Sequence, residues 1–261
     1  MGLEQRFSGG HSCGRIVSLS MKRKKWLLGA GVLLVMTAAL ILTKRWKPNS
    51  VAAGRYPVQG IDVSHYQGEI DWKQIEAQGI DFAWIKATEG SSYVDEYFQA
   101  NWKAAEQTAL YIGAYHFFSF DSDGGTQADL FIRTVGDLSG KLLPAVDVEY
   151  YGDKRNSPPD KEAVIRELKE MLERLEAEYQ VKPVIYTTYS VYKKYIRGDF
   201  SDYPLWIRNV YVPPGPSVRD WTFWQYTDTA VLEGYEGSEK YIDRNVFRGT
   251  KEEMKEMLVS P

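Results

Sequence analysis

From Val58 onward, short apolar runs alternate with amphipathic segments along the chain. Runs of this length are typical of buried strands, whereas apolar side chains at three- and four-residue spacing indicate helices. Residues 160–180 carry the clearest helical stripe: Val164, Leu168, Met171, Leu172, Leu175 and Tyr179. Strands are predicted at 60–64, 82–88, 112–118, 142–150, 183–187, 204–207, 222–226 and 241–247. Helices are predicted from Asp71, at 95–109, 125–137, 160–180 and 189–197, and from Thr250.

The order of these elements favours a closed barrel. Five strand–helix units are followed by three strands with little helix between them, so the strands number eight. Eight strands of parallel type close a barrel whose interior is filled by side chains. No glycine-rich phosphate loop follows the first strand, which counts against a dinucleotide-binding sheet. We therefore predict an α/β fold, a TIM-like barrel of the (β/α)5(β)3 type, over residues 58–258.

An uncharged apolar run, residues 26–43, precedes this domain and has basic clusters on both sides. Its length is at the lower limit for crossing a bilayer of ~30 Å. No small-x-small cleavage site closes the run, so we expect a transmembrane signal-anchor, with a cleaved signal peptide as the alternative. The larger basic cluster, residues 22–25, favours an N-terminus in the cytoplasm and a domain outside the cell membrane.

The segments around the run complete the domain organisation. Residues 1–25 are basic, and residues 1–20 lack periodicity, so we expect disorder there. Met21 stands before the basic cluster and is an alternative start. Residues 44–57 are predicted to form a linker. If the apolar run is cleaved, the protein is secreted; otherwise it is a single-pass membrane protein.

Charge is divided unevenly between these parts. Residues 1–50 carry nine Lys and Arg against one acid, a net charge of +8, whereas the remainder carries 23 against 34, a net charge of −11. An acidic folded part argues against a nucleic-acid partner, because phosphate binding needs a basic face. The single cysteine, Cys13, excludes an intrachain disulfide, and the three histidines lack zinc-site spacing. We predict a monomer with no metal and no cofactor.

Two carboxylates, Asp147 and Glu149, end the predicted strand 142–150. Strand side chains alternate between faces, so both acids point the same way. Like charges roughly 6–7 Å apart in a partly dry site raise one pKa, which leaves a proton donor beside a carboxylate. Glycosidic bond cleavage needs this division of labour. The pair by itself is equally consistent with two solvated acids at a strand end.

The barrel adds two more acids to this pair. Active sites of such barrels lie at the C-terminal ends of the strands. Asp62, Asp147, Glu149 and Asp243 are predicted late in strands one, four and eight, alternating with apolar residues that face the outer helices. Strands one and eight become neighbours on closure, and strand four lies across the mouth. We therefore predict that the four acids converge as a catalytic group, against the alternative of scattered surface acids.

Aromatic side chains gather near the same strand ends. Flat rings with polar edges suit sugar faces, although core packing explains each ring alone equally well. A lysine inside a barrel needs an anionic partner, and the acids are the obvious partner for Lys86. His65 and His116 are expected to be hydrogen-bonding scaffold. The substrate-binding candidates are Lys86, Tyr66, Tyr115, Tyr186, Trp206, Trp224 and Gln225.

Six short stretches carry a family resemblance, in a fixed order over residues 57–258. They are Gly60-Ile-Asp-Val-Ser-His-Tyr-Gln-Gly68, Ile85-Lys-Ala-Thr-Glu-Gly90 with Tyr93 and Asp95, Gly113-Ala-Tyr-His-Phe117, Pro144-Ala-Val-Asp-Val-Glu149, Trp224-Gln-Tyr226 and Asp243-Arg-Asn245. Each is weak alone, but the ordered set is specific. It resembles the glycoside hydrolase family 25 muramidases, the Chalaropsis-type lysozymes.

This resemblance implies an enzyme that cleaves the β-1,4 bond between N-acetylmuramic acid and N-acetylglucosamine in peptidoglycan glycan strands. It implies Glu149 as the general acid and Asp147 as the assisting carboxylate. Asp62 and Asp243 would hold the sugar and keep Glu149 protonated. Two alternatives are a chitinase-like acetamido-sugar hydrolase, which also ends strand four with Asp-x-Glu, and a non-catalytic cell-wall-binding module.

Overall fold

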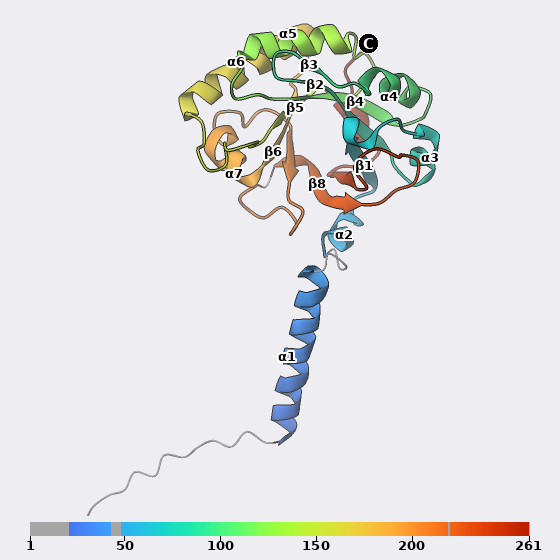
Figure 1. Cartoon of the computed structure of the whole chain (residues 1–261), viewed down its shortest axis with the longest axis vertical. Coiled ribbons are helices and arrows are strands. Elements are labelled where there is room, and N and C mark those ends of the chain that lie inside the picture. The colour runs from blue at the N-terminus through green and yellow to red at the C-terminus, as the bar shows by residue number, and fades with distance from the viewer. Residues whose placement is uncertain (1–20, 43–47, 219, 261) are drawn as a thin grey trace, which may run out of the picture. The chain divides into compact units, whose positions relative to one another are not determined.

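The computed structural model describes residues 21–42, 48–218 and 220–260, and the chain divides into two units, residues 1–46 and 47–261. In the first unit, α1 (Met21–Leu42) begins ahead of the predicted start at residue 26 (Figure 1). None of the helices in the described ranges combines the length and the apolar character that a bilayer crossing requires. The predicted end at Thr43 and the predicted disorder of residues 1–20 lie outside the described residues, so both stay predictions.

The second unit is built around a closed ring of strands. The ring strands are β1 (Val58–Val63), β2 (Phe82–Glu89), β4 (Tyr111–Phe117), β5 (Ala145–Val148), β6 (Val184–Thr188), β7 (Leu205–Arg208), β8 (Trp221–Ala230) and β9 (Ile242–Phe247). They are ordered β1-β9-β8-β7-β6-β5-β4-β2, and pairing of β1 with β2 closes the ring. The predicted eight-stranded barrel is confirmed. The two-residue β3 (Tyr93–Val94), which was not predicted, pairs with the end of β2 outside the ring.

One strand of the ring runs against the others. β1 through β8 pair in parallel around the ring, whereas β9 is antiparallel to both β8 and β1. The expectation that Asp243 lies late in its strand is therefore wrong, because Asp243 is the second residue of β9. The reversed direction places the beginning of β9 at the mouth, where the other strands end, so Asp243 pairs with Asp62 in the register.

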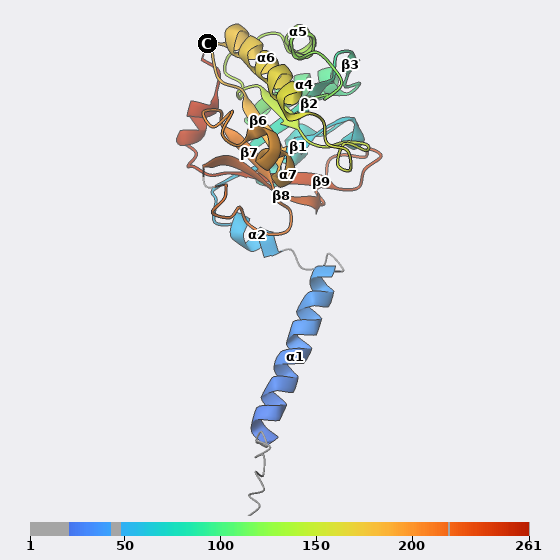
Figure 2. The same ribbon diagram turned by 90° about the vertical axis from the view of Figure 1, so that its left-hand side faces the viewer.

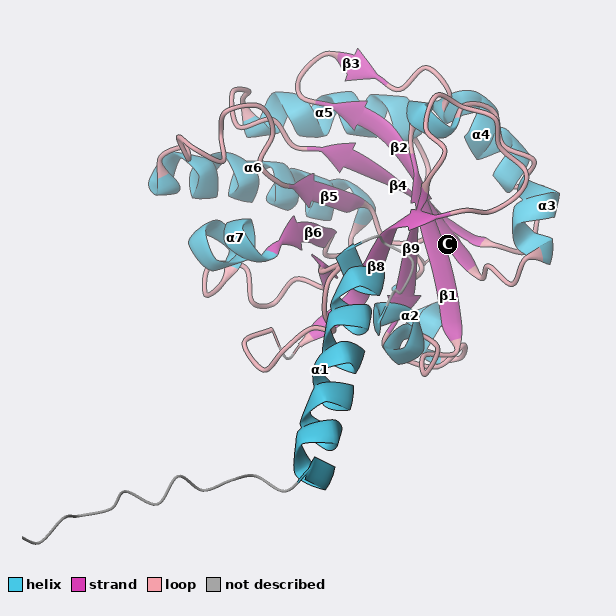
Figure 3. Ribbon diagram, turned by 60° about the horizontal axis from the view of Figure 1, so that its bottom comes forward, coloured by secondary structure: helices cyan, strands magenta, loops and turns pink. Residues whose placement is uncertain are grey.

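Helices cover the outside of the strands (Figure 3). They are α3 (Trp72–Ala77), α4 (Phe98–Ala105), α5 (Gly124–Val135), α6 (Lys161–Tyr179) and α7 (Tyr189–Val191), which continues into a turn of wider pitch at Tyr192–Ile196. The longest of them, α6, lies beside α5 (Figure 2). Asp160 caps its first turn by accepting from the backbone of Ala163, and its predicted apolar stripe is fully buried. The predicted terminal helix is a 3₁₀ turn at Glu253–Met257.

The ring interior is packed with aromatic side chains in layers. At the closed end, Phe223 contacts Phe82 and Phe247, with ring centroids 5.5 Å and 5.1 Å apart. Above them, Trp84 stacks on Trp206 with ring centroids 4.4 Å apart. These layers fill the barrel below its mouth, so the polar side chains at the strand ends rest on a dry floor.

Gly113 on β4 makes room for this floor. A Cβ at this position would lie 2.5 Å from Nε1 of Trp84 and 2.8 Å from Cβ of Leu142. Both distances are far below van der Waals contact. Glycine is therefore required here for the close approach of a strand to an indole ring, and not for an unusual backbone conformation.

The predicted linker, residues 44–57, is in part a folded piece of the barrel domain. It contains α2 (Pro48–Ala53), whose Asn49 is buried and donates from Nδ2 to the carbonyl oxygens of Asn209 and Tyr226 at 2.9 Å and 3.0 Å. Tyr56 packs edge-on against Trp221, with ring centroids 5.3 Å apart. The folded part, residues 48–57, was not foreseen because a short polar segment with Pro and Gly has no periodicity that would mark it as folded.

Candidate active site

Two adjoining cavities open at the mouth of the barrel, with volumes of about 200 Å³ and 270 Å³. They share the side chains of Asp62, Ser64, Tyr66, Tyr115 and Asp243, and so form one groove. The smaller cavity is also lined by Lys86, Phe117, Asp147, Glu149, Tyr186 and Trp206. All four predicted acids therefore line a common space, as the barrel geometry requires of residues at the mouth.

Asp62 and Asp243 form a bridged pair on β1 and β9. Oδ1 of Asp62 accepts from Nδ2 of Asn245 at 2.7 Å and from Nε2 of Gln225 at 3.0 Å. The same Gln225 nitrogen lies 3.2 Å from Oδ2 of Asp243, and the two carboxyl groups also share a hydrogen bond. Burial raises the pKa of both acids, that of Asp243 well above its usual range because the Asp62 charge adds to the effect. A proton held between them is the expected consequence.

Two aromatic residues orient the amides that bind these acids. The hydroxyl of Tyr186 donates to Oε1 of Gln225 at 2.9 Å, so the Gln225 amide nitrogen faces the carboxylates. Nε1 of Trp206 donates to Oδ1 of Asn245 at 2.8 Å, with the same result for Asn245. The indole N–H of Trp206 can only donate, so it sets which end of the Asn245 amide faces it. The Tyr186 hydroxyl can donate or accept, and the carboxyl oxygens of Asp62 and Asp243 set the Gln225 amide from its other end. Tyr186 and Trp206 line the cavity and also hold its acids in place.

Asp147 and Glu149 lie across the groove at the end of β5. Asp147 is 8% exposed, and among the described residues its Oδ1 has no hydrogen-bond partner. Burial and the Glu149 charge hold the pKa of Asp147 well above its usual range. Burial also raises the pKa of Glu149, and the charge of Arg208 opposes that increase. Two carboxyl groups so placed favour one proton between them, which supplies one acid and one base.

The sequence suggested that Lys86 pairs with the four acids, but the structure pairs it with Glu89 instead. Its Nζ lies 2.6 Å from Oε2 of Glu89, three residues on in the same strand. The ammonium also lies over the rings of Tyr93 and Phe117, at 5.6 Å and 5.0 Å from their centroids. The partner was missed because a bulge between Lys86 and Thr88 turns Glu89 toward the side on which Lys86 lies.

Arg208 is a further charged group at the site that the sequence reasoning did not single out. It ends β7 two residues after Trp206, so both side chains share the inner face, and its Nη2 pairs with Oδ2 of Asp228 at 2.8 Å. Its charge lowers the pKa of Asp62 and of Glu149, against the effect of burial. Because side chains alternate along a strand, the inward position of Trp206 indicates that Arg208, two residues later, also points inward. This was the signal in the sequence that could have identified Arg208.

Trp224 is the one predicted binding residue that the structure places away from the groove. It is fully buried on the outer face of β8, where it packs against Tyr56, Trp221 and Tyr226, and its Nε1 donates to the carbonyl of Asn209. The neighbouring Gln225 points inward instead. Trp224 has no ring face to offer a sugar, so we remove it from the substrate-binding set. The remaining candidates line the groove or, for Gln225, bind its acids.

The two histidines of the domain act as scaffold, as expected. Burial lowers the pKa of His116 to about 4, so the ring is neutral. It lies between the hydroxyl of Thr88, 2.7 Å from Nδ1, and Oε1 of Gln127, 3.1 Å from Nε2. Nδ1 of His65 lies 3.0 Å from the buried carboxylate of Asp95. Neither ring lines the cavity that holds the four acids.

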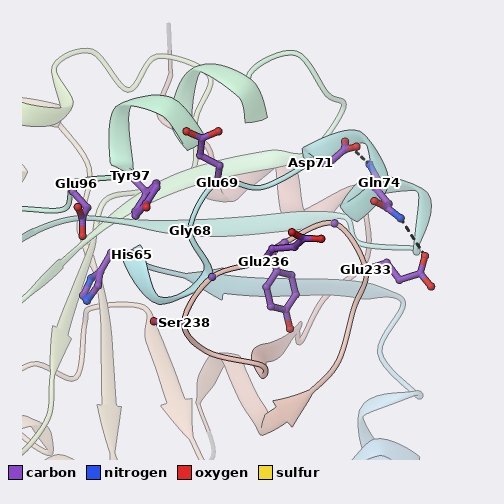
Figure 4. A pocket seen from close by; sticks show the side chains of 13 residues that line it. His65, Gly68, Glu69, Asp71, Gln74, Glu96, Tyr97, Glu233, Glu236 and Ser238 are labelled. Carbon is purple, nitrogen blue, oxygen red and sulfur yellow. Dashed lines mark hydrogen bonds between the residues drawn. The ribbon is translucent and has the colours of Figure 1, made fainter.

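A larger cavity, of about 1010 Å³, lies between α3 and the loop before β9 (Figure 4). Its acids are Glu69, Asp71, Glu96, Glu233 and Glu236, all exposed to solvent. Asp71 caps α3 by accepting from the backbone of Gln74, and the side chain of Gln74 donates to Glu233. These carboxylates are exposed, whereas the acids of the groove are buried or half-buried, so the reaction is assigned to the groove.

Carboxylates that could hold a metal ion come together once among the described residues, at Asp123, Glu167 and Glu170. Asp123 and Glu170 are exposed, and Glu167 already accepts from the backbone of Gly124 at 3.0 Å. The cluster lies on α5 and α6, outside the groove. The absence of a metal from the reaction stays a prediction.

Residues 61–235 match the family model described as Glycosyl hydrolases family 25. A solved family 25 glycosyl hydrolase of Bacillus anthracis is 49% identical, with a TM-score of 0.73 over 77% of this chain and 94% of that one. Lysozyme M1 of Streptomyces globisporus is 36% identical over 74% of this chain and 68% of its own length. The N,O-diacetylmuramidase of Chalaropsis sp is 30% identical over 72% of this chain and 95% of its own.

Proposed function

This chain belongs to glycosyl hydrolases family 25, and from that premise we propose that it is a muramidase. Its substrate is the glycan strand of peptidoglycan, cut at the β-1,4 bond between N-acetylmuramic acid and N-acetylglucosamine. The relatives named lysozyme and N,O-diacetylmuramidase support this activity. The observation that carries the proposal is the pair of Asp147, which is buried, and Glu149, which is half-buried, at the mouth of a groove walled by tyrosines.

In the proposed reaction, Glu149 is the general acid. Burial raises the pKa of its carboxyl group, so the group keeps its proton to a higher pH than an ordinary glutamate and can give it to the leaving glycosidic oxygen. As the bond from C1 to that oxygen breaks, the leaving sugar departs as an alcohol. Glu149, now a carboxylate, then takes a proton from the water that attacks C1.

Asp147 is proposed to act through the 2-acetamido group of the sugar. Residues two apart on a strand are about 6–7 Å apart, at the lower limit of the space that an inverting pair needs for its water. We therefore propose that the acetamido oxygen attacks C1 and forms a cyclic oxazolinium ion, which water then opens. The buried Oδ1 of Asp147, which has no hydrogen-bond partner in the described part of the chain, is suited to accept a hydrogen bond from the acetamido N–H.

The test of the acid is Glu149→Gln, which keeps the shape of the side chain and removes its proton. We expect turnover of purified peptidoglycan to fall by about 10²–10⁴-fold with glycan binding retained. Glu162→Gln, at an exposed position on α6, is the matched control and should behave as the unaltered protein. Undiminished turnover in Glu149→Gln contradicts the assignment, and cleavage of chitin in preference to peptidoglycan favours the chitinase-like alternative.

The stereochemistry of the product tests the role of Asp147. Attack by the acetamido group followed by water inverts C1 twice, so the first product formed should be the β anomer. Proton NMR of the reaction mixture within the first minutes distinguishes this from the α anomer. A first-formed α product would rule out the acetamido route.

We also propose that residues 26–43 tether the enzyme to the cell membrane as a single pass, with the N-terminus in the cytoplasm. The support is the uncharged apolar run between basic clusters. A blot of fractionated cells should find the full chain in the membrane pellet and a chain beginning at residue 47 in the soluble fraction. Recovery of a shortened native protein from the medium would indicate a cleaved signal peptide instead.

A further inference from the structure

The stretch 60–68 contains two residues that the proposed reaction does not use, Gln67 and Gly68. They lie in the turn that follows β1. The same turn carries Tyr66, which is 51% exposed and lines both cavities of the groove. Whatever holds this turn therefore also holds one wall of the groove.

The β8–β9 loop, residues 231–241, is hydrogen-bonded to this turn. The backbone N–H of Glu239 donates to the carbonyl oxygen of Tyr66 at 3.0 Å. The side chain of Gln67 is buried, and its Nε2 donates to the carbonyl oxygen of Tyr241 at 3.0 Å. Both bonds use a backbone carbonyl group, so they fix the path of the chain and not only the direction of a side chain.

The loop continues along the residues that follow the turn. Ile70 and Tyr235 form an antiparallel bridge, and the backbone N–H of Asp71 donates to the carbonyl oxygen of Gly234 at 2.8 Å. Between these contacts and the first two, the loop passes beside Gly68 (Figure 4). The loop thus follows the whole turn and holds it along its length.

Gly237 allows the two backbones to lie in contact. A Cβ at this position would overlap the carbonyl oxygen of Tyr66 and would lie 2.6 Å from Cα of Gln67. On the other side of the contact, a Cβ at Gly68 would lie 3.3 Å from Cα of Gly237. The atoms in the way belong to the backbone and cannot rotate aside as a flexible side chain can. Glycine is therefore required at this close approach, and any side chain at Gly237 must push the loop off the turn.

We propose that Gly237 and Gln67 are positioning residues for substrate binding, because they hold the β8–β9 loop against the turn and so fix the ring of Tyr66 at the groove. The inference rests on the proposed muramidase function, in which this groove takes the glycan. The ring of Tyr66 packs on that of His65 in the same turn, with centroids 4.1 Å apart, so it takes its position from the turn. A ring that is fixed before the glycan arrives loses less freedom on binding, which strengthens the binding.

The first test is Gly237→Ala, which adds one methyl group at the contact. In the full chain, we expect KM for soluble glycan strands to rise by about 2- to 10-fold with kcat unchanged, because an aromatic contact is weakened and the acids stay in place. Tyr66→Ala should raise KM in the same way. The double substitution should be no worse than Tyr66→Ala alone, because Gly237 acts through that ring. Ser238→Ala, at an exposed position next in the loop, is the matched control and should leave KM unchanged.

Gln67→Met tests the same contact from the side of the turn. Methionine has about the length of glutamine but cannot donate to the carbonyl oxygen of Tyr241 or replace Oε1 of Gln67 as the acceptor for the backbone N–H of Ser64. KM should rise as in Gly237→Ala, again with kcat unchanged. This variant carries the test if Gly237→Ala does not fold. If neither variant folds, the contact serves the fold as a whole and the proposal is overturned.

Other roles of the contact give other results. If it only stabilises the fold, Gly237→Ala and Gln67→Met lower the melting temperature and leave KM unchanged. If the loop positions Asp243, two residues beyond its end, kcat falls and KM stays. If the effects of Gly237→Ala and Tyr66→Ala add, the loop acts on the glycan by another route. Each of these patterns overturns the proposal.

A measurement without substrate separates this inference from the proposed function. Hydrogen exchange of the full chain, followed by mass spectrometry, should be faster in Gly237→Ala for peptides from residues 64–71 and 233–241 and unchanged for α6. If exchange is faster but the unaltered protein does not cleave peptidoglycan, the loop still holds the turn and the muramidase assignment is lost. If exchange is unchanged in an active enzyme, the muramidase assignment stands and the role of the loop is refuted.

Discussion

Asp62 and Asp243 are acids that the fold holds together away from water, at a cost to the stability of the folded state when they ionise. Each acid is partly shielded from water. The Asp62 charge raises the pKa of Asp243, whereas the hydrogen bond with Asp243 lowers the pKa of Asp62 against the effect of burial. Amide donors from Gln225 and Asn245 compensate for only part of the lost hydration. A group that prefers its neutral form in the folded state makes folding less favourable wherever the pH forces it to ionise.

Replacement of Asp243 by Asn should therefore stabilise the protein in a pH-dependent manner. The folded-state pKa of Asp243 lies above the unfolded value of about 3.9, so its stabilising contribution is present below about pH 4 and lost as pH rises through the folded pKa. Asp243→Asn should match the unaltered protein near pH 4 and exceed it by about 1–3 kcal/mol at pH 7.

Urea unfolding at the two pH values measures the difference. Asp153→Asn, at an exposed position, is the control and should show no pH-dependent gain. A gain of equal size at both pH values would mean that Asp243 destabilises the fold by a mechanism other than burial of its charge.

At the same scale, the sequence was sufficient to identify the acids but not the direction of every aromatic ring. Asp62, Asp147 and Asp243 could be found because a charged residue in an apolar strand has few explanations. Trp224 and Gln225 could not be separated, because β8 is buried on both faces and carries large side chains on each. Arg208 was overlooked because it stands at the end of a short strand, where a surface position is equally reasonable.

Among the elements, β2 and β4 show how tightly the barrel floor restricts its residues. Gly113→Ala would place a methyl group within 2.5 Å of the Trp84 indole, in a position that stacking on Trp206 prevents from moving. Overpacking of this kind costs typically 1–3 kcal/mol. Thermal unfolding followed by tryptophan fluorescence should show the loss. Gly215→Ala, where a Cβ meets nothing within 4 Å, is the control and should be neutral.

Element directions were the part of the fold least accessible from the pattern. The pattern of apolar and polar residues in a strand does not depend on the direction of the strand in the sheet. The sequence of residues 241–247 therefore does not indicate that β9 is antiparallel. The prediction that Asp243 lies at the mouth was right, but its reason was wrong. We expected Asp243 late in a parallel strand, whereas it lies early in an antiparallel strand. Both positions lie at the same end of the barrel. The two-residue strand β3 was too short to show any periodicity.

For the whole molecule, the boundary of the domain lies upstream of β1. Asn49 binds the carbonyl of Asn209, just after β7, and that of Tyr226, within β8, and Ala53 is buried. A chain of residues 47–261 should therefore fold alone and cleave soluble glycan at the full rate. A chain of residues 58–261 should be less stable, because α2 no longer satisfies those carbonyls.

The contribution of Asn49 itself is measurable in the longer chain. Asn49→Ala should lower the free energy of unfolding by about 1–3 kcal/mol, since the Tyr226 carbonyl loses its Asn49 donor and the Asn209 carbonyl keeps only the Trp224 indole N–H. Ser50→Ala, next to it and exposed, is the control and should have no comparable effect. If the chains 47–261 and 58–261 are equally stable, and Asn49→Ala and Ser50→Ala are equally stable too, residues 48–57 are only a linker.

The pairing of Val58 with Phe247 determines where the ends of the domain meet. Because β9 is reversed, the first residue of β1 and the last residue of β9 are neighbours at the closed end of the ring, and the residues after β9 stay there through the contact of Leu258 with Leu142. A short peptide could join these ends into a covalent circle, and the circle could be opened at another exposed connection. The order of the strands along the chain would change, while the groove and its acids would keep every neighbour they have.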